Sequence, residues 1–209
     1  MAPSQLTLEK ITVEDVPAMI DIWFAAFTGP HVRKAMPDTP GVRKWFADCT
    51  INDITEHPHQ TYLKIVDLES NYNEGKPRMV AWGKWDSSMP DERGPRFFLP
   101  WTEEMDSDFC SLVFDAYDKN RKKVMGDEKH VFLDTLCTHP DYWRRGAGSM
   151  VVKWGCDLAD KEGVSAYLDS SKDGAPLYQK FGFVDEGTPE DTSAPMARRK
   201  RERSGESNE

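Results

Sequence analysis

The chain has 209 residues, a formal net charge of −9 at pH 7 and a hydrophobic fraction of 38%. This length and composition suit one compact α/β domain with a sizeable core. The acidic charge argues against non-specific binding of nucleic acid. We see no basic-then-apolar leader and no apolar run of membrane length, so we expect a cytoplasmic protein that does not contact a membrane.

The cysteine and histidine spacing does not predict a metal site or a disulfide. The cysteines are far apart and form no Cys-x-x-Cys pair, so we expect reduced, buried thiols. His57 and His59 could bind a metal only if a third ligand came from elsewhere, and no third ligand is identifiable in the sequence. A solvated loop pair is the simpler interpretation, and we predict no metal.

The N-terminal quarter of the chain predicts one strand and two helices. Alternating apolar residues indicate a strand over 4–11, and Thr12 begins a capping box. Helical spacing of apolar and aromatic residues follows over 16–28 and 41–54, with a loop over 29–40 between them. Because loops commonly carry specificity, we expect 29–40 to help select a substrate.

The middle of the chain predicts a hairpin, an insertion and a helix. Two apolar runs, 61–67 and 78–85, are joined by a polar turn. The segment 87–102 is rich in Pro, Gly and charge, and an amphipathic helix over 108–123 follows it. Four residues of the insertion are too apolar for a free loop, so we expect them to fold back over the core or over the mouth of a site (Phe97, Phe98, Leu99 and Trp101).

A strand over 131–137 stops at Pro140 and leads through a basic, glycine-rich turn into a helix. The turn and first helical turn comprise Arg144, Arg145, Gly146, Ala147, Gly148 and Ser149. Free N–H groups at a helix N-terminus and the helix dipole favour a bound anion, and glycines allow its close approach. Plain turn chemistry is the alternative. The motif is neither a Walker A loop nor the dinucleotide-binding fingerprint.

A second motif, Ala-Pro-Leu-Tyr-Gln-Lys-Phe-Gly-Phe-Val over 175–184, follows a strand at 164–169. In this order the two motifs resemble the GNAT superfamily of acetyl-CoA-dependent N-acetyltransferases, in particular its fungal and bacterial small-molecule members. The resemblance covers 131–186, about a quarter of the chain. It implies a mixed, mostly antiparallel central sheet that splays between strands 4 and 5, with acetyl-CoA in the splay and helices on both faces.

We therefore expect a single GNAT-like domain over 1–187, with its core motifs in 131–186, and a charged, disordered tail over 188–209. Residues 195–198 are a candidate last edge strand. The basic run 198–203 also allows nuclear import, although a solvated tail is the simpler interpretation.

The resemblance implies roles for two side chains in direct attack of an amine on the thioester. Tyr178 has the position of the tyrosine that protonates the departing thiolate, and packing beside Phe181 and Phe183 is its alternative. Asp134 has the position of the acidic residue that takes the amine proton through water, although its side chain is short for that role. Strand alternation would place Asp134, Leu136 and Thr138 on one face and Leu133, Thr135 and Cys137 on the other.

The resemblance also implies a set of acetyl-CoA contacts. The main chain of Leu136, Cys137 and Thr138 would pair with the pantetheine arm and polarise the thioester carbonyl. The pyrophosphate would lie on the turn over 144–149. The chain departs from the family pattern at Trp143, where Gln or Arg is common, and at Ser171, where Asn is common. The basic end of the helix over 119–123 could touch the 3′-phosphate, or simply be solvated.

The function implied is acetyl transfer to a primary amine of a small molecule, by a monomer or homodimer. An aromatic pocket (Trp23, Phe24, Phe27, Trp82 and Trp85) would suit an apolar or aromatic amine. A peptide or protein amine remains an alternative acceptor. An acyl-CoA-binding module without turnover and a nucleotide-phosphate enzyme are the alternative classes, the latter disfavoured by the lack of a Walker lysine or a metal-binding acidic pair.

Overall fold

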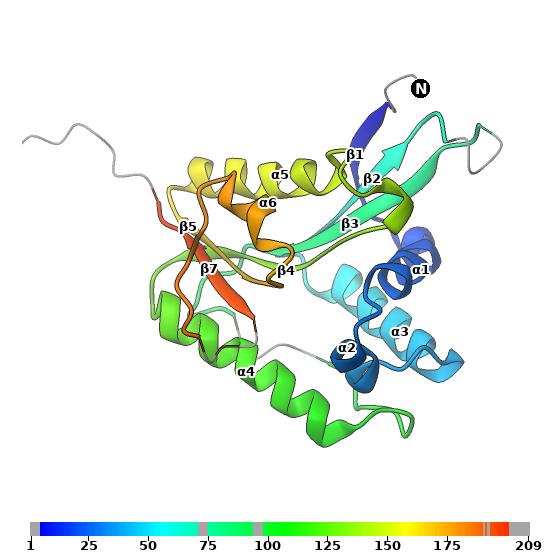
Figure 1. Ribbon diagram of the computed structural model, residues 1–209, viewed down its shortest axis with the longest axis horizontal. Coiled ribbons are helices and arrows are strands. Elements are labelled where there is room, and N and C mark those ends of the chain that lie inside the picture. Colours follow the sequence, from blue (N-terminus) through cyan, green and yellow to red (C-terminus); the bar gives the residue numbers. More distant parts are fainter. Residues whose placement is uncertain (1–4, 71–74, 94–97, 190, 192, 201–209) are drawn as a thin grey trace, which may run out of the picture.

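The computed structural model describes residues 5–70, 75–93, 98–189, 191 and 193–200, and its centre is a seven-stranded sheet (Figure 1). The strands are β1 (Leu6–Lys10), β2 (Gln60–Asp67), β3 (Arg78–Asp86), β4 (His130–Thr138), β5 (Ser165–Ser170), β6 (Val184–Asp185) and β7 (Ala194–Arg198). The α-helices are α1 (Val16–Ala26), α2 (Pro30–Ala35), α3 (Pro40–Glu56), α4 (Ser107–Met125), α5 (Ala147–Glu162) and α6 (Ala175–Gln179).

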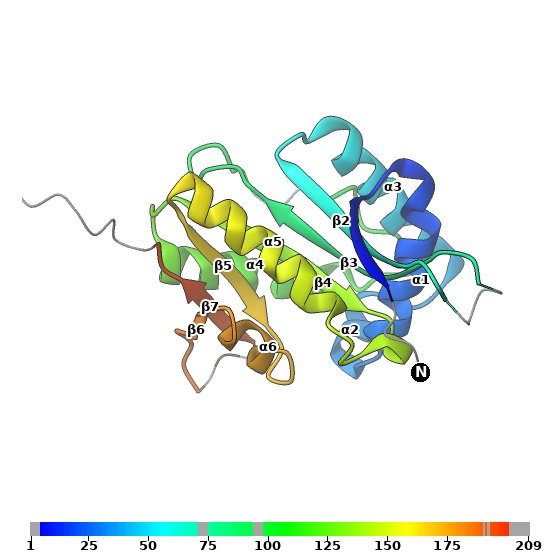
Figure 2. The same ribbon diagram turned by 90° about the horizontal axis from the view of Figure 1, so that it is seen from above.

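The strand order in the sheet is β1-β2-β3-β4-β5-β7-β6. Neighbouring strands run antiparallel except β4 and β5, which are parallel. Helices cover both faces: α5 and α6 lie on one, and α1 to α4 on the other (Figures 1 and 2). The α/β fold class and the mixed, mostly antiparallel sheet are confirmed.

Helix α5 crosses the sheet and forms the main core with it (Figure 2). It follows Gly146 and ends at Gly163, both of which have a positive φ that suits glycine. Its buried residues recur at helical spacing and face β2 to β5 (Val151, Val152, Gly155, Cys156 and Ala159). The helix that the sequence predicted after the glycine-rich turn is therefore present.

Trp85 of β3 lies flat against α5 at Gly155. Its indole N–H donates to the carbonyl oxygen of Val151 at 3.1 Å, and its ring fills the space that a Cβ at Gly155 would occupy. Glycine in the middle of a helix is normally unfavourable. Here it is required because the bulky indole packs against the helix backbone.

Two local predictions need correction. Residues 30–35 form the short helix α2 inside the segment expected to be a loop, with Pro30 at its first position, where proline is well tolerated. Strand β7 is not an edge strand, because it lies between β5 and β6 and pairs with both. The sheet thus extends past residue 187. Arg198 forms a bidentate ion pair with Asp160, at 2.8 Å for each contact.

Strand β4 leaves β5 halfway along its length. The parallel pairing runs from His130 opposite Ser165 to Leu133 opposite Leu168. Beyond Leu133, β4 continues to Thr138 and pairs only with β3 among the described strands. The splay predicted between strands 4 and 5 is confirmed.

A β-bulge changes the direction of the side chains at the splay. Lys84 lies opposite Thr135 and Trp85 opposite Leu133, so Asp134 is the extra residue of the bulge. Asp134 and Thr135 therefore both face the α1–α4 side, where they line one cavity. Leu136 packs with the α5 core. The expected alternation, with Asp134 on the face of Leu136 and Thr138, was wrong because alternation assumes a regular strand.

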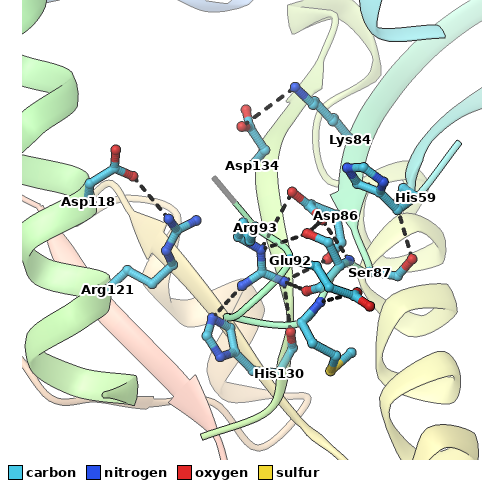
Figure 3. Close-up of polar contacts among 12 residues, drawn as sticks. His59, Lys84, Asp86, Ser87, Glu92, Arg93, Asp118, Arg121, His130 and Asp134 are labelled. Atoms are coloured by element: carbon cyan, nitrogen blue, oxygen red, sulfur yellow. Dashed lines mark hydrogen bonds and ion pairs between the residues drawn. The ribbon is translucent and has the colours of Figure 1, made fainter. Parts of the chain in front are cut away.

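Arg93 fixes the loop after β3 to the start of β4 (Figure 3). Its guanidinium donates to the carbonyl oxygens of Ser88 and His130 and, at 2.7 Å, to Nε2 of His130. The other ring nitrogen of His130, Nδ1, donates to the carbonyl oxygen of Glu128 at 2.6 Å. His130 is therefore held as the neutral imidazole. Burial, with the charges of Arg93 and Arg121, lowers its pKa to about 4.

We predict that Gly155→Ala destabilises the protein by about 1–3 kcal/mol or more, because the new methyl group overlaps the Trp85 ring. Gly29→Ala is the matched control, since a Cβ at Gly29 meets nothing within 4 Å. It should cost less than about 1 kcal/mol. Urea denaturation of both variants measures this, and equal stabilities would contradict the packing described for Trp85.

We also predict that stability falls as the pH drops from 6.5 towards 4. The pKa of His130 is about 4 in the folded chain against 6.5 ordinarily, so in this window the unfolded chain binds a proton that the folded chain does not. The stabilisation is complete above pH 6.5 and is lost at up to about 1.4 kcal/mol per pH unit. Urea denaturation at several pH values should show a shallower slope for His130→Asn, and an unchanged slope would contradict the neutral, buried imidazole.

Candidate active site

The splay places two different surfaces on either side of β4. On the α5 side, the end of β4 meets the N-terminus of α5 and the start of α6. On the other side, β4 borders a cavity lined by α1, α3, α4 and β3. The main chain between Asp134 and Thr138 lies between these surfaces. Polar main-chain groups at such a gap need a partner, and an extended ligand can supply one.

The glycine-rich turn has the geometry of an anion site. Arg144 and Gly146 both adopt a positive φ, of 62° and 91°. Arg144 is in a conformation that non-glycine residues seldom adopt, which costs of order 1 kcal/mol and is typical of functional turns. The N–H groups of Ala147, Gly148 and Ser149 lie in the first turn of α5, which has no acidic residue. Arg144 and Arg145 are exposed beside it.

Gly148 brings three elements together. A Cβ placed on it would lie 3.3 Å from Cδ2 of Leu177, 3.7 Å from Oγ1 of Thr138 and 3.8 Å from Cδ2 of Leu136. A larger residue would therefore crowd both β4 and α6. Thr138, Leu136 and the turn were predicted to share one cofactor site, and the fold gathers them at one place.

Cys137 faces the opposite side. Its thiol is buried with Trp82 and Met19, and burial raises its pKa well above the ordinary value. Only its main chain is placed to contribute to the gap. Ser171 is exposed, and its hydroxyl accepts a hydrogen bond from the Gly174 N–H at 3.1 Å. It thus stabilises the turn that begins α6.

Trp143 connects the glycine-rich turn to the end of β4. Its indole N–H donates to the carbonyl oxygen of Thr138 at 2.8 Å, while 58% of the residue remains exposed. The residue that departs from the family pattern therefore links the turn to the end of β4. Sequence spacing gave no sign of this contact.

Tyr178 lies on the α5 side of the gap. It is buried in the main core and makes an edge-to-face contact with Phe183 at 6.1 Å between ring centroids. Burial raises the pKa of its phenol, and the neighbouring Cys137 raises it further. The hydroxyl therefore carries its proton at neutral pH. Tyr178 and Asp134, the two predicted catalytic residues, belong to opposite sides of the gap.

The cavity on the other side has a volume of about 110 Å³ and mostly aromatic walls. Its aromatic residues come from six segments far apart in sequence (Trp23, Trp45, Phe46, Tyr62, Trp82, Phe98 and Phe114). Phe98 packs on Trp45 and on Phe114, with 5.9 Å and 4.5 Å respectively between ring centroids. Phe98, from the insertion after β3, folds back over this cavity, as the sequence predicted. Phe97 lies outside the described residues.

The aromatic prediction for this cavity is correct only for Trp23 and Trp82. Trp85 packs against α5 on the far face of the sheet. Phe24 is buried beneath the guanidinium groups of Arg33 and Arg43. Neither Phe24, Phe27 nor Trp85 lines the cavity.

A buried ionic cluster lies at one end of this cavity, and its members come from three elements. The Lys84 ammonium lies 2.7 Å from the Asp53 carboxylate and 3.8 Å from that of Asp134 (Figure 3). Tyr62 donates to Asp53 at 2.7 Å, and burial followed by the Asp53 charge raises the pKa of its phenol. Thr135 donates to Asp134 at 2.8 Å. The apolar surroundings make such a charged group costly, which is typical of a functional site.

Sequence reasoning missed Asp53 and Lys84. Asp53 lies in α3 and Lys84 in β3, and only the tertiary fold brings them to Asp134. The one available signal was a Lys between two tryptophans in β3, a poor position for a charge unless it is paired.

Two other candidates, a basic segment and a histidine pair, lie outside these two surfaces. The basic residues 119–123 lie at the C-terminal end of α4, next to the start of β4 and at the opposite end of that strand from the turn. His57 and His59 contact each other at 5.9 Å between rings. Within the described residues no group of three His, Cys, Asp or Glu side chains is arranged to hold a metal ion. Over the same residues, no helix combines the length and apolar character that a bilayer crossing needs.

Comparison with solved structures supports the fold. The chain aligns with a Corynebacterium glutamicum protein described as histone acetyltransferase HPA2 and related acetyltransferase, with a TM-score of 0.61 and 19% identity over 96% of this chain and 99% of that one. It also aligns with the PaiA N-acetyltransferase of Thermoplasma acidophilum, which was solved with coenzyme A, with a TM-score of 0.54, 12% identity and coverage of 93% and 99%.

Two fungal sequences are similar over shorter stretches. An acetyltransferase of Stachybotrys chartarum is 26% identical over 126 residues, which is 57% of this chain and 54% of that protein. A probable acyltransferase SID5 of Ajellomyces capsulatus is 40% identical over 40 residues, 19% of this chain and 29% of that protein. The chain therefore spans about half or less of these relatives. The family model of the acetyltransferase (GNAT) family matches residues 18–183, and the chain belongs to this family.

Proposed function

We propose that the protein is an N-acetyltransferase that moves the acetyl group of acetyl-CoA to a primary amine of a small molecule, by direct attack in a ternary complex. The observation that carries this proposal is the gap between β4 and β5, with an anion site on one side and a carboxylate-bearing aromatic cavity on the other. The two substrates can approach the same stretch of β4 from opposite sides.

The α5 side fits acetyl-CoA. Family membership supports this co-substrate. The free N–H groups of Ala147, Gly148 and Ser149, with Arg144 and Arg145, would bind the pyrophosphate. The main chain of 136–138, which has no described strand partner on its β5 side, would pair with the pantetheine arm as an added strand does.

The chemistry needs one proton acceptor and one proton donor. As the amine nitrogen bonds to the thioester carbonyl carbon, its proton passes to Asp134, directly or through water. A main-chain N–H of β4 would stabilise the oxyanion. The carbon–sulfur bond then breaks, and the thiolate takes the proton of Tyr178. Burial keeps that phenol protonated beforehand, so the proton is present when the thiolate forms.

The cavity favours a small acceptor. A volume of about 110 Å³ behind aromatic walls suits a compact amine with an apolar body. The carboxylates of Asp53 and Asp134 suit its ammonium group. A peptide or protein amine would need a wider opening to reach the carboxylates of Asp53 and Asp134.

We predict that Asp134→Asn lowers kcat by about 100-fold or more, because the amide cannot accept the amine proton. Tyr178→Phe should lower kcat while leaving stability nearly unchanged, since it removes only the hydroxyl and keeps the contact with Phe183. Thiol release with acetyl-CoA and a panel of small primary amines measures both. A protein that binds acetyl-CoA but acetylates no amine would instead be a binding module.

We further predict that replacing Arg144 and Arg145 together by Ala weakens acetyl-CoA binding by about 10-fold or more, because each guanidinium can form charge-assisted bonds to phosphate. Calorimetric titration measures the dissociation constant. The double variant should also lose part of the salt dependence of binding. The control is desulfo-CoA, which keeps the phosphates and should show the same loss. An unchanged affinity would place the pyrophosphate elsewhere.

A further inference from the structure

A second cavity, of about 410 Å³, lies at the start of β4, at the opposite end of that strand from the glycine-rich turn. Its lining is rich in charge, with four cationic side chains, three carboxylates and one buried histidine (Arg93, Arg121, Lys122, Lys129, Asp91, Asp118, Asp127 and His130). Nothing in the proposed chemistry uses these residues. The cavity is also larger than the aromatic one, so it can hold part of a ligand.

Arg93 and Arg121 both line this cavity, and each forms an ion pair, with Asp86 and Asp118 respectively. Burial and the charge of Arg121 together lower the pKa of Arg93 to about 10, although Asp86 opposes this. The same Arg121 charge disfavours protonation of His130. The Arg121 charge therefore disfavours further positive charge here and favours an anion.

Arg121 is the group best placed to bind that anion. Its side chain is only 15% exposed, and its guanidinium lies 4.8 Å above the Phe132 ring, which fixes its position. Within the described residues it donates one hydrogen bond, from Nη2 to Asp118 at 3.2 Å. A guanidinium has five N–H donors in a planar fork. Arg93, in contrast, already serves Ser88 and His130.

The two cavities are lined by successive residues of the same two elements. On β4, Asp134 lines the aromatic cavity and His130 the charged one, with Phe132 between them. On α4, Phe114 lines the first cavity, and Asp118 and Arg121, one and two turns further, line the second. Figure 3 shows Asp134 and His130 along β4, with Asp118 and Arg121 on the neighbouring helix α4. The Arg121 guanidinium lies over the Phe132 ring, two strand residues from Asp134, which is about 7 Å along β4.

We propose that the acceptor is an amine carrying an anionic group, a carboxylate or phosphate about 7 Å from the nitrogen, with the amine at Asp134 and the anion at Arg121. This inference rests on the proposed function and names its substrate class. The apolar middle of such a molecule would lie along β4 between Asp134 and Phe132, whose ring Arg121 covers. Arg121 is then a specificity-determining residue that contacts the substrate away from the reacting atoms.

The test uses two ligands of equal length. One is an aminoalkyl benzoate whose ammonium and carboxylate are about 7 Å apart, and the other is the matching aminoalkyl benzamide, which lacks the negative charge. Calorimetric titration of the full chain gives the dissociation constant of each, with no need for turnover. The variants are Arg121→Met, which keeps the aliphatic stem over Phe132, and Arg121→Lys, which keeps a charge. The matched control is Lys123→Met, an equal charge change at an exposed position of α4 that does not line the cavity.

The wild type should bind the benzoate about 10- to 100-fold more tightly than the benzamide, as a charge-assisted contact provides. Arg121→Met should abolish that preference, Arg121→Lys should keep part of it, and Lys123→Met should keep all of it. In the thiol-release assay, Arg121→Met should raise KM for the benzoate and leave kcat unchanged, because uniform binding is lost.

The inference is overturned if the wild type shows no preference for the benzoate, or if Arg121→Met retains it. It is also overturned if inorganic phosphate binds at Arg121 without competing with the benzoate, since the cavity would then serve a separate anion. Failure of the proposed function looks different: the benzoate would bind with the predicted preference, but neither ligand would be acetylated.

Discussion

The early end of the pairing between β4 and β5 is the constraint on which the site depends. Main-chain N–H and C=O groups in a protein interior need partners, and four residue pairs, His130 to Leu133 with Ser165 to Leu168, supply them. Past Leu133, the main-chain groups of β4 that face the gap must form hydrogen bonds to a ligand or to water. The gap also lets one ligand reach the thioester position from the α5 side and another from the α1–α4 side. A fully paired parallel sheet would separate these two spaces.

The bulge at Asp134 makes this gap chemically useful. In a regular strand, Asp134 would share a face with Leu136 and point towards the α5 core, where a carboxylate would be desolvated without a partner. The extra residue turns it to the aromatic cavity, where Lys84 lies 3.8 Å away and Thr135 donates at 2.8 Å. Burying the charges of Lys84 and Asp53 together with Asp134 costs more free energy than burying apolar residues of similar size would. Such a cluster persists where it serves a function.

Local sequence signals predicted the parts of this protein that local interactions determine. The turn at 144–149, helix α5 and the Leu-Tyr-x-Lys-x-Gly-Phe segment depend on glycine conformation and helical periodicity, and these gave the family and the splayed sheet. The bulge, the ion pair of Lys84 with Asp53 and the insertion of β7 between β5 and β6 depend on contacts between distant segments. Alternation in β3 could not tell which tryptophan, Trp82 or Trp85, faces the cavity, because the sheet buries both faces.

The two charged regions along β4 would also determine which way an acceptor binds. A zwitterion with its ammonium at Asp134 and its anion at Arg121 gains at both ends. The reversed molecule places a carboxylate against Asp53 and Asp134 and an ammonium against Arg121 and Arg93, so it loses at both. Orientation is therefore selected by repulsion as much as by attraction. The net charge of −9 adds to this, because it draws cations in general but gives anions no favourable position except where cationic side chains gather. An acceptor bound at both its ammonium and its anion would therefore present only its nitrogen to the thioester.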